Sequence, residues 1–219
     1  RRQRQMCIRD RLKTRLLSSG QKQIVLLAAD DHPSQYPTVL AIIKMGQILR
    51  RLSHNTMTIE IYPGAQLGSE QDVLEQTLFG AIDIARLSTN ALNHINSDTT
   101  LLSLPYVFNS TTSMHEVVDG PIGREILASF KNAGYIGLAF YDSGVRSFYN
   151  TKKPLYTPTD VHGLKIRVQA SDVMVAMIKS LGGNPTTMDF GEVYNALHLG
   201  DIDGAENNIP SYYSTKHYT

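Results

Sequence analysis

Apolar and polar residues follow two different periods along the chain, and the changes of period divide it into strands and helices. A short apolar run at Gln23–Ala28 is typical of a buried strand. Apolar residues then recur at helical spacing over Tyr36–Leu52, and Met57–Tyr62 alternates as a second strand. A strand, a helix and a strand in this order predict a right-handed crossover between neighbouring strands of a parallel sheet.

The middle of the chain continues this pattern with more turn residues. A helix is expected from Ser69, a suitable N-cap, to Gly80, and a strand at Ile82–Leu87. A further helix is expected at Pro121–Ala133, because proline is well tolerated in a first helical turn. The alternation in Tyr135–Tyr141 predicts another strand.

The last third alternates between strand and helix. Strands are expected at Ser147–Asn150, Leu164–Val168, Asn184–Asp189 and Asp201–Glu206, and helices at Val173–Leu181 and Phe190–Leu199. In the strand expected at Leu164–Val168, the apolar side chains lie on one face, and those of Lys165 and Arg167 lie on the other. Regular alternation of strands and helices predicts an α/β fold.

Composition is that of a globular protein. The 219 residues are 42% hydrophobic and 19% charged, and no apolar run approaches the length needed to span a bilayer. The net charge of +1 conceals an asymmetry, because residues 1–22 hold eight Lys or Arg and one acid, whereas the rest holds thirteen and nineteen. The body of the chain is therefore mildly acidic, which argues against a nucleic-acid-binding surface.

The basic N-terminus lacks the apolar core of a secretory signal. A transit peptide or a nucleic-acid-binding arm is an alternative interpretation. The run Met6–Arg11 also resembles a translated adapter sequence, so we expect residues 1–19 to be a non-native or disordered tail, and residues 1–18 to pack against nothing. The single cysteine, Cys7, lies in this segment, so thiol chemistry plays no part elsewhere.

One arginine is a candidate for binding an acid. Arg167 leaves a strand beside the small and polar residues 169–171, where its planar fork could hold a carboxylate through two parallel hydrogen bonds. The alternative is an exposed arginine in a surface ion pair. Arg146 lies at a similar strand-to-turn edge, and Asn207 follows a strand end, where open α/β sheets bind ligands.

Other chemistries lack their motifs. The seven histidines form no HxH or HExxH pattern, so no metal is expected. The chain has no GxGxxG after a strand, no phosphate-binding P-loop and no GxSxG elbow, so no cofactor is expected. No pair of carboxylates with a base partner stands out, so we do not expect an enzyme.

Several separated motifs, in order, resemble the DctP-type solute-binding proteins of TRAP transporters. They are IEIYPGAQLGSEQDVLEQ, DIARLSTNAL, LLSLPYVF, GLKIRVQ, GGNPTTMDFGEVYNAL and GDIDGAENNIPSYYSTKHY. The resemblance extends from about Gln23 to the last residue. It implies an α/β, two-lobed periplasmic-binding-protein-like fold with a ligand cleft between the lobes. Lobe I is expected at 20–143 and lobe II, incomplete because the chain is C-terminally truncated, at 144–219.

The resemblance also implies roles for particular residues. Arg167 occupies the position of the arginine that clamps the ligand carboxylate, and Arg146 and Asn207 match further ligand-contacting positions. Phe190 matches an aromatic residue that walls the pocket, although an ordinary core phenylalanine is an alternative interpretation.

In the first lobe, the resemblance places His32 and Glu70 at the border of the pocket. His32 could instead be a loop residue satisfied by Asp30 or Asp31. Three polar residues come at the end of the strand expected at Ile82–Leu87, and they could donate hydrogen bonds to ligand hydroxyls: Ser88, Thr89 and Asn90.

The function implied is that of a periplasmic receptor. It captures a small organic acid, a uronate or another sugar acid, by an arginine–carboxylate clamp and delivers it to the membrane permease of a TRAP transporter. Nucleic acid is not an expected partner, and the receptor itself does not span the membrane. The alternatives are an enzyme of sugar-acid metabolism and a ligand-sensing domain of a signalling protein.

Overall fold

The computed structural model describes residues 13–17, 20 and 22–219. The chain divides into two compact units, one ending at Leu87 and the other formed by Ser88–Thr219, and each is described by itself. This division does not coincide with the lobes expected at 20–143 and 144–219. Those lobe boundaries refer to the complete receptor fold and stay a prediction.

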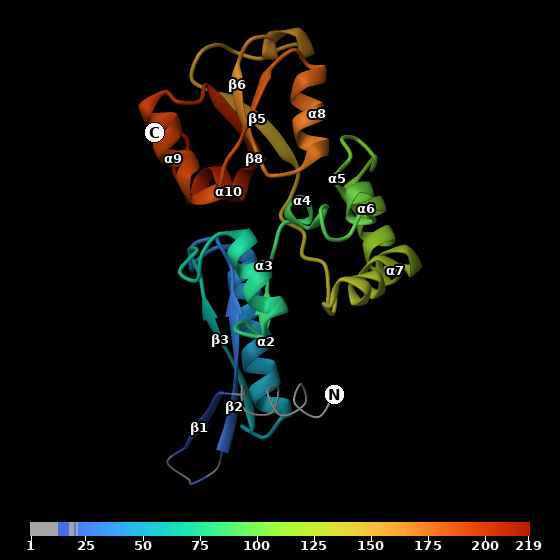
Figure 1. Ribbon diagram of the computed structural model, residues 1–219, viewed down its shortest axis with the longest axis vertical. Coiled ribbons are helices and arrows are strands. Elements are labelled where there is room, and N and C mark those ends of the chain that lie inside the picture. Colours follow the sequence, from blue (N-terminus) through green and yellow to red (C-terminus); the bar gives the residue numbers. More distant parts are fainter. Residues whose placement is uncertain (1–12, 18–19, 21) are drawn as a thin grey trace. The chain divides into compact units, whose positions relative to one another are not determined.

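The first unit is a small sheet whose central strand is β2 (Lys22–Ala29). It is followed by helix α2 (Pro37–Leu52) and strand β3 (Met57–Tyr62), which lie side by side in Figure 1. β3 pairs in parallel with β2 over the whole length of β3, from Ile24 opposite Met57 to Ala29 opposite Tyr62. The predicted strand–helix–strand crossover is therefore confirmed.

Helix α3 (Glu70–Leu78) begins where the sequence predicts, because Ser69 and Asp72 each bind the other's backbone N–H in a capping box. The following strand, β4 (Ile84–Ala85), is shorter than the predicted Ile82–Leu87. It pairs in parallel with only the last two residues of β2. The first four residues of β2 pair with another strand, β1 (Lys13–Leu16).

Strand β1 (Lys13–Leu16) pairs antiparallel with β2, from Lys13 opposite Val25 to Leu16 opposite Lys22. Arg15 also forms an ion pair with Glu60 of β3 at 3.1 Å. The expectation that residues 1–18 pack against nothing is therefore wrong for this strand. The remainder of that expectation concerns residues 1–12 and 18, which lie outside the described residues. The non-native origin of residues 1–19 stays a prediction.

The second unit begins with short helices, α4 (Thr89–Leu92), α5 (Thr99–Ser103) and α6 (Thr111–Val118). Helix α7 (Pro121–Ser129) continues as a 3-10 turn (Phe130–Ala133) and ends at Gly134, whose φ of 88° is left-handed. The predicted helix at Pro121–Ala133 is thereby confirmed, with its last turn tightened.

The strand predicted at Tyr135–Tyr141 is wrong, because these residues form no regular element. Alternating side chains make a strand only where a neighbour supplies a hydrogen-bonding ladder. No described strand pairs with this segment, and Ile136 is 83% and Leu138 65% exposed. The apolar positions of the pattern therefore have no sheet face to join.

The sheet of the second unit has the order β5-β8-β6-β7. Its strands are β5 (Arg146–Asn150), β6 (Lys165–Val168), β7 (Asn184–Thr187) and β8 (Gly204–Asn208). β5 runs antiparallel to β8, and the other neighbours are parallel. Pro185 lies in the edge strand β7, where a missing N–H is tolerated. All four expected strands are present, with shifts of up to three residues at their ends.

Helices lie over both faces of this sheet. They are α8 (Asp172–Ser180), α9 (Val193–Leu199) and α10 (Ile209–Ser214), with 3-10 turns at Pro158–Val161 and Phe190–Glu192. Ile166 and Val168 pack with α8, whereas Ala205 packs with α9. The two mixed sheets with their helices confirm the α/β fold class. None of the helices in the described part of the chain is long and apolar enough to cross a membrane.

Candidate functional site

The candidate acid-binding arginine lies on the α9 face of the second sheet. Alternation along β6 puts Arg167 opposite to Ile166 and Val168, which pack against α8. The strand register then aligns Arg167 of β6 with Ala205 of β8, and Ala205 with Tyr149 of β5. These three side chains form a row across one face of the sheet.

Arg167 is only 2% exposed, so it is not an arginine in contact with bulk water. Its Nε and Nη2 atoms donate to the carbonyl oxygen of Met188 at 3.0 and 2.7 Å. The carbonyl therefore fixes the plane of the guanidinium, and a buried cation held in one orientation is suited to binding a carboxylate. The alternative of an exposed surface ion pair is excluded.

Arg146 lies on the opposite face of this sheet, together with Glu206 and Phe148, according to the same register. Its Nε and Nη2 donate to the two carboxylate oxygens of Glu206 at 2.5 and 2.9 Å. The Glu206 side chain is 3% exposed, so this is a buried, bidentate ion pair. The ligand contact expected of Arg146 stays a prediction, and the fork of this residue is engaged by Glu206.

Asn207 shares the face of Arg167, because it lies two residues from Ala205 in β8. It is 6% exposed, and its Oδ1 accepts a hydrogen bond from the N–H of Asn208. Phe190 begins the 3-10 turn before α9, and its ring meets that of His217 edge-on at 6.1 Å. The structure thus gathers Arg167, Asn207 and Phe190 near one face, while their contacts with a ligand stay predictions.

A buried histidine completes this group. His217 is 8% exposed, and its Nδ1 lies 2.7 Å from the phenolic oxygen of Tyr149. Burial, together with the positive charge of Arg167, lowers the pKa of His217 to about 4. Burial also raises the pKa of Tyr149, so both groups are neutral at pH 7.

This neutral histidine makes stability depend on pH. His217 titrates at a higher pH in the unfolded chain, near 6.5, so the unfolded state binds more protons between pH 6.5 and 4. The free energy of unfolding should therefore fall by about 2 kcal/mol on acidification from pH 7 to 5 through this group alone. Denaturant unfolding of the wild type and of His217→Phe at pH 7 and pH 5 measures this decrease. The variant has no imidazole at this position, so its free energy of unfolding should fall by about 2 kcal/mol less than that of the wild type. Equal decreases in the two proteins would contradict the prediction.

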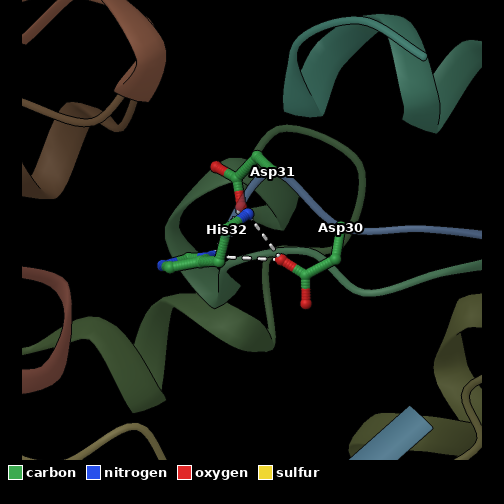
Figure 2. Close-up of side chains that lie close together, drawn as sticks. All are labelled: Asp30, Asp31 and His32. Carbon is green, nitrogen blue, oxygen red and sulfur yellow. Dashed lines mark hydrogen bonds and ion pairs between the residues drawn. The ribbon is translucent and has the colours of Figure 1, made fainter. Parts of the chain in front are cut away.

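The first unit contains a second cluster, at the carboxyl ends of its parallel strands. Asp30, Asp31 and His32 follow β2, and Figure 2 shows their side chains turned toward one another. The Oδ1 of Asp30 accepts from the His32 backbone N–H at 2.9 Å, and its Oδ2 accepts from Thr38 at 2.8 Å. The His32 ring lies 2.7 Å from Asp31 through Nδ1, and it contacts the Tyr36 ring at a tilt of 31°, with ring centroids 3.9 Å apart.

Arg86 holds this cluster together. It follows β4, whose pairing with β2 brings it beside Asp30. Its Nε donates to Asp30 Oδ2 at 2.8 Å and its Nη2 to Asp31 Oδ1 at 2.5 Å, and Nη2 also contacts Asp30 Oδ1 and His32 Nδ1. The Asp30 side chain is fully buried and that of Arg86 is 12% exposed. The result is a buried ionic network at the sheet edge.

The charges in this network shift one another's pKa values. Burial alone would raise the pKa of Asp30, but the hydrogen bonds from Arg86 and His32 hold it well below its usual range. Burial would lower the pKa of His32, but its hydrogen bonds to Asp30 and Asp31 outweigh this and raise it. Burial would likewise lower the pKa of Arg86, but its acidic partners Asp30 and Asp31 outweigh this and raise it. Each group therefore favours its charged form.

The side chains of Asp30, Asp31 and His32 are also close enough to share a metal ion. The Nη2 atom of Arg86 contacts the Oδ1 atoms of Asp30 and Asp31 and the Nδ1 atom of His32. A cation bound there would have to displace the guanidinium. The arrangement therefore fits an arginine-centred ionic network better than a metal centre.

The remaining candidates have mixed surroundings. Glu70 lies beside the ionic network of Asp30 and Arg86 in the first unit, with its Oε1 3.9 Å from Arg86 Nη1. Ser88 precedes α4 and Thr89 begins it. Asn90 is 5% exposed and donates to Gln169 Oε1 at 2.6 Å, which connects α4 to the loop after Arg167. A ligand contact for any of these residues stays a prediction.

Several residues of these clusters were not singled out from the sequence. Arg86, Glu206, Tyr149 and His217 each acquire their role from a partner more than fifty residues away. The one available signal was an arginine directly after a short apolar strand, at Ile84–Arg86, because charged residues rarely follow buried strands without a partner. Nothing in the local pattern identified the other three.

Comparison with known proteins identifies the family of the chain. Residues 28–219 match the family described as bacterial extracellular solute-binding protein, family 7, DctP. A solute-binding protein of Chromohalobacter salexigens is 41% identical over 187 residues, which are 85% of this chain and 56% of that protein.

Two solved structures are also similar, both of TRAP periplasmic solute-binding proteins. One, from a Bradyrhizobium species in complex with D-galacturonate, is 50% identical, with a TM-score of 0.86 over 88% of this chain and 64% of that one. The other, from Xanthobacter autotrophicus with bound β-D-galacturonate, is 47% identical with the same TM-score and coverage.

The chain thus spans 56% of the length of this curated relative and 64% of each solved chain. The family match covers most of the chain, and the resemblance stated from the sequence motifs is confirmed. The chain belongs to the DctP family, the bacterial extracellular solute-binding proteins of family 7.

Proposed function

We propose that this chain is part of an extracytoplasmic receptor that captures a hexuronate through its carboxylate. The observation that carries the proposal is the buried guanidinium of Arg167, fixed by the carbonyl of Met188 on the α9 face of the second sheet. A carboxylate gives such a guanidinium two parallel, charge-assisted hydrogen bonds. A neutral sugar or an amine cannot do so.

The rest of the ligand is recognised by polar and aromatic groups. Asn207 shares the face of Arg167, and Phe190 and Tyr149 supply aromatic surface nearby. A ring bearing several hydroxyls needs oriented donors and acceptors as well as an apolar wall. For His32, which follows β2, and Glu70, which begins α3, we propose hydrogen bonds to ligand hydroxyls.

Capture follows from differential affinity. A ligand that binds two parts of a receptor favours the conformation in which both parts contact it. We propose that the sugar acid stabilises a closed form, in which it is shielded from water until a permease receives it.

Hexuronates are preferred over other acids as the ligand. The two solved relatives that are 47% and 50% identical both contain galacturonate. C4-dicarboxylates are the alternative, because one curated relative, 32% identical, is a C4-dicarboxylate-binding periplasmic protein. The proposed location is the periplasm, and the proposed partner is the membrane permease of a TRAP transporter.

Calorimetry on the full-length protein tests this proposal. D-galacturonate should bind with micromolar or tighter affinity, corresponding to about −8 kcal/mol or better. Succinate should bind at least about a hundredfold more weakly, because it lacks hydroxyls to pair with the site's polar groups. Methyl galacturonate, whose esterified carboxyl cannot form the ion pair, is the matched control and should not bind. Equal binding of the ester and the free acid would contradict a carboxylate clamp.

A further inference from the structure

The residue beside Arg167 in the row across the sheet is small. Neighbouring strands are about 4.8 Å apart, so the backbones at Arg167 and Tyr149 lie about 10 Å apart, with Ala205 between them. Ala205 is fully buried although its side chain is a single methyl group. The imidazole of His217, bonded to Tyr149, therefore lies over the same sheet face as Arg167.

The bond to Tyr149 selects the tautomer of His217. A phenol O–H is a much stronger acid than the N–H of a neutral imidazole, so Tyr149 donates and Nδ1 accepts. A neutral imidazole that accepts at Nδ1 carries its proton on Nε2. The lowered pKa keeps His217 neutral at physiological pH. His217 thus presents one N–H donor, at Nε2.

This donor lacks an acceptor. Nε2 is buried, and no atom of the described residues accepts a hydrogen bond from it. Buried donors in native proteins are nearly always paired, because leaving one unpaired is costly. Arg167 cannot serve, since a guanidinium has only donors. His217 and Arg167 thus each have N–H donors over the same face of the sheet, and an anion is the group that can accept from both.

We propose that His217 is a further ligand-binding residue, which donates from Nε2 to the carboxylate that Arg167 holds. This inference rests on the proposed function. In the present arrangement Nε2 is sealed from solvent. The groups that cover Nε2 must therefore move when a carboxylate reaches it, and the receptor then closes around the bound acid. Arg167 supplies charge and a planar fork, and His217 supplies a neutral, directional donor that fixes the position of the carboxylate.

The test compares variants of the full-length protein by titration calorimetry with D-galacturonate. Tyr149→Phe/His217→Phe removes both members of the internal hydrogen bond and keeps two aromatic rings, so the fold should be retained. This double variant should bind about ten- to a hundredfold more weakly than the wild type. His217→Gln, whose amide N–H can replace Nε2–H, should recover part of the affinity. His198→Phe, an exposed histidine on α9, is the matched control and should bind normally.

Nitrogen-15 NMR of the imidazole supplies a readout that a purely structural role would not change. The Nε2–H tautomer should be present in the free protein, and its proton should move downfield when the acid binds. An acceptor for Nε2 that is the same with and without ligand, whether a bound water or another part of the full-length chain, would overturn the inference.

The outcomes separate this inference from the proposed function. If the wild type binds, Arg167→Ala does not, and the double variant binds as tightly as the wild type, the inference alone is wrong. If the wild type binds no acid, both are wrong.

Discussion

Arg167→Ala in the full-length protein should reduce the affinity for a hexuronate by about a hundredfold or more. The guanidinium is buried and held by Met188, so a bound carboxylate would lose both of its charge-assisted hydrogen bonds and remain in a largely water-free site. Loss of one partner of a buried charged pair costs about 2–5 kcal/mol, which corresponds to that change in affinity. Calorimetry with D-galacturonate measures it.

Two further variants make this result specific. Arg167→Lys keeps the charge but loses the planar fork, so it should recover only a small part of the affinity. Arg124→Ala removes an exposed arginine of α7 whose side chain donates to the Asp119 carbonyl, and this variant should bind like the wild type. Near-native affinity of a folded Arg167→Ala would mean that the carboxylate binds elsewhere, and the clamp proposal would fail.

Asp30→Ala should lower the free energy of unfolding by about 3–5 kcal/mol. The substitution leaves Arg86, 12% exposed, with a buried charge that has lost its main partner. It also deprives Thr38 and the His32 backbone of their acceptor. The effect is large because the network joins the ends of β2 and β4, which share only two paired residues. Denaturant unfolding at pH 7 measures the change.

The control for this prediction is the exposed ion pair between Arg15 and Glu60. Glu60→Ala removes the partner of Arg15 at 3.1 Å, where both side chains are about half exposed. Its effect should be about 1 kcal/mol or less. Equal effects of Asp30→Ala and Glu60→Ala would show that burial does not strengthen the network.

Acid should also remove the contribution of Asp30 to the free energy of unfolding. Its folded-state pKa is depressed, so its stabilisation is present above its ordinary pKa and is lost as the pH falls below about 4. The difference in stability between the wild type and Asp30→Ala should therefore shrink at low pH.

The sequence determined most elements because their signals are local. The crossover from β2 through α2 to β3, the Ser69 cap of α3 and the Gly134 stop after α7 each depend on residues that are neighbours in the chain. The separated family motifs likewise need no three-dimensional information. The strand predicted at Tyr135–Tyr141 failed for the complementary reason, since a strand depends on a partner that its own residues do not specify.

The candidate site shows the same division. The sequence identified Arg167 as a strand arginine beside a polar loop, but left open whether it faced water or a buried site. Only the tertiary structure decided this, because the strand register of β5, β8 and β6 places Arg167, Ala205 and Tyr149 on one face and Arg146 with Glu206 on the other. It likewise assembled Arg86 with Asp30, and His217 with Tyr149. Side-chain pairs separated by more than fifty residues are fixed by strand order and helix packing, which the local pattern of hydrophobic and polar positions does not contain.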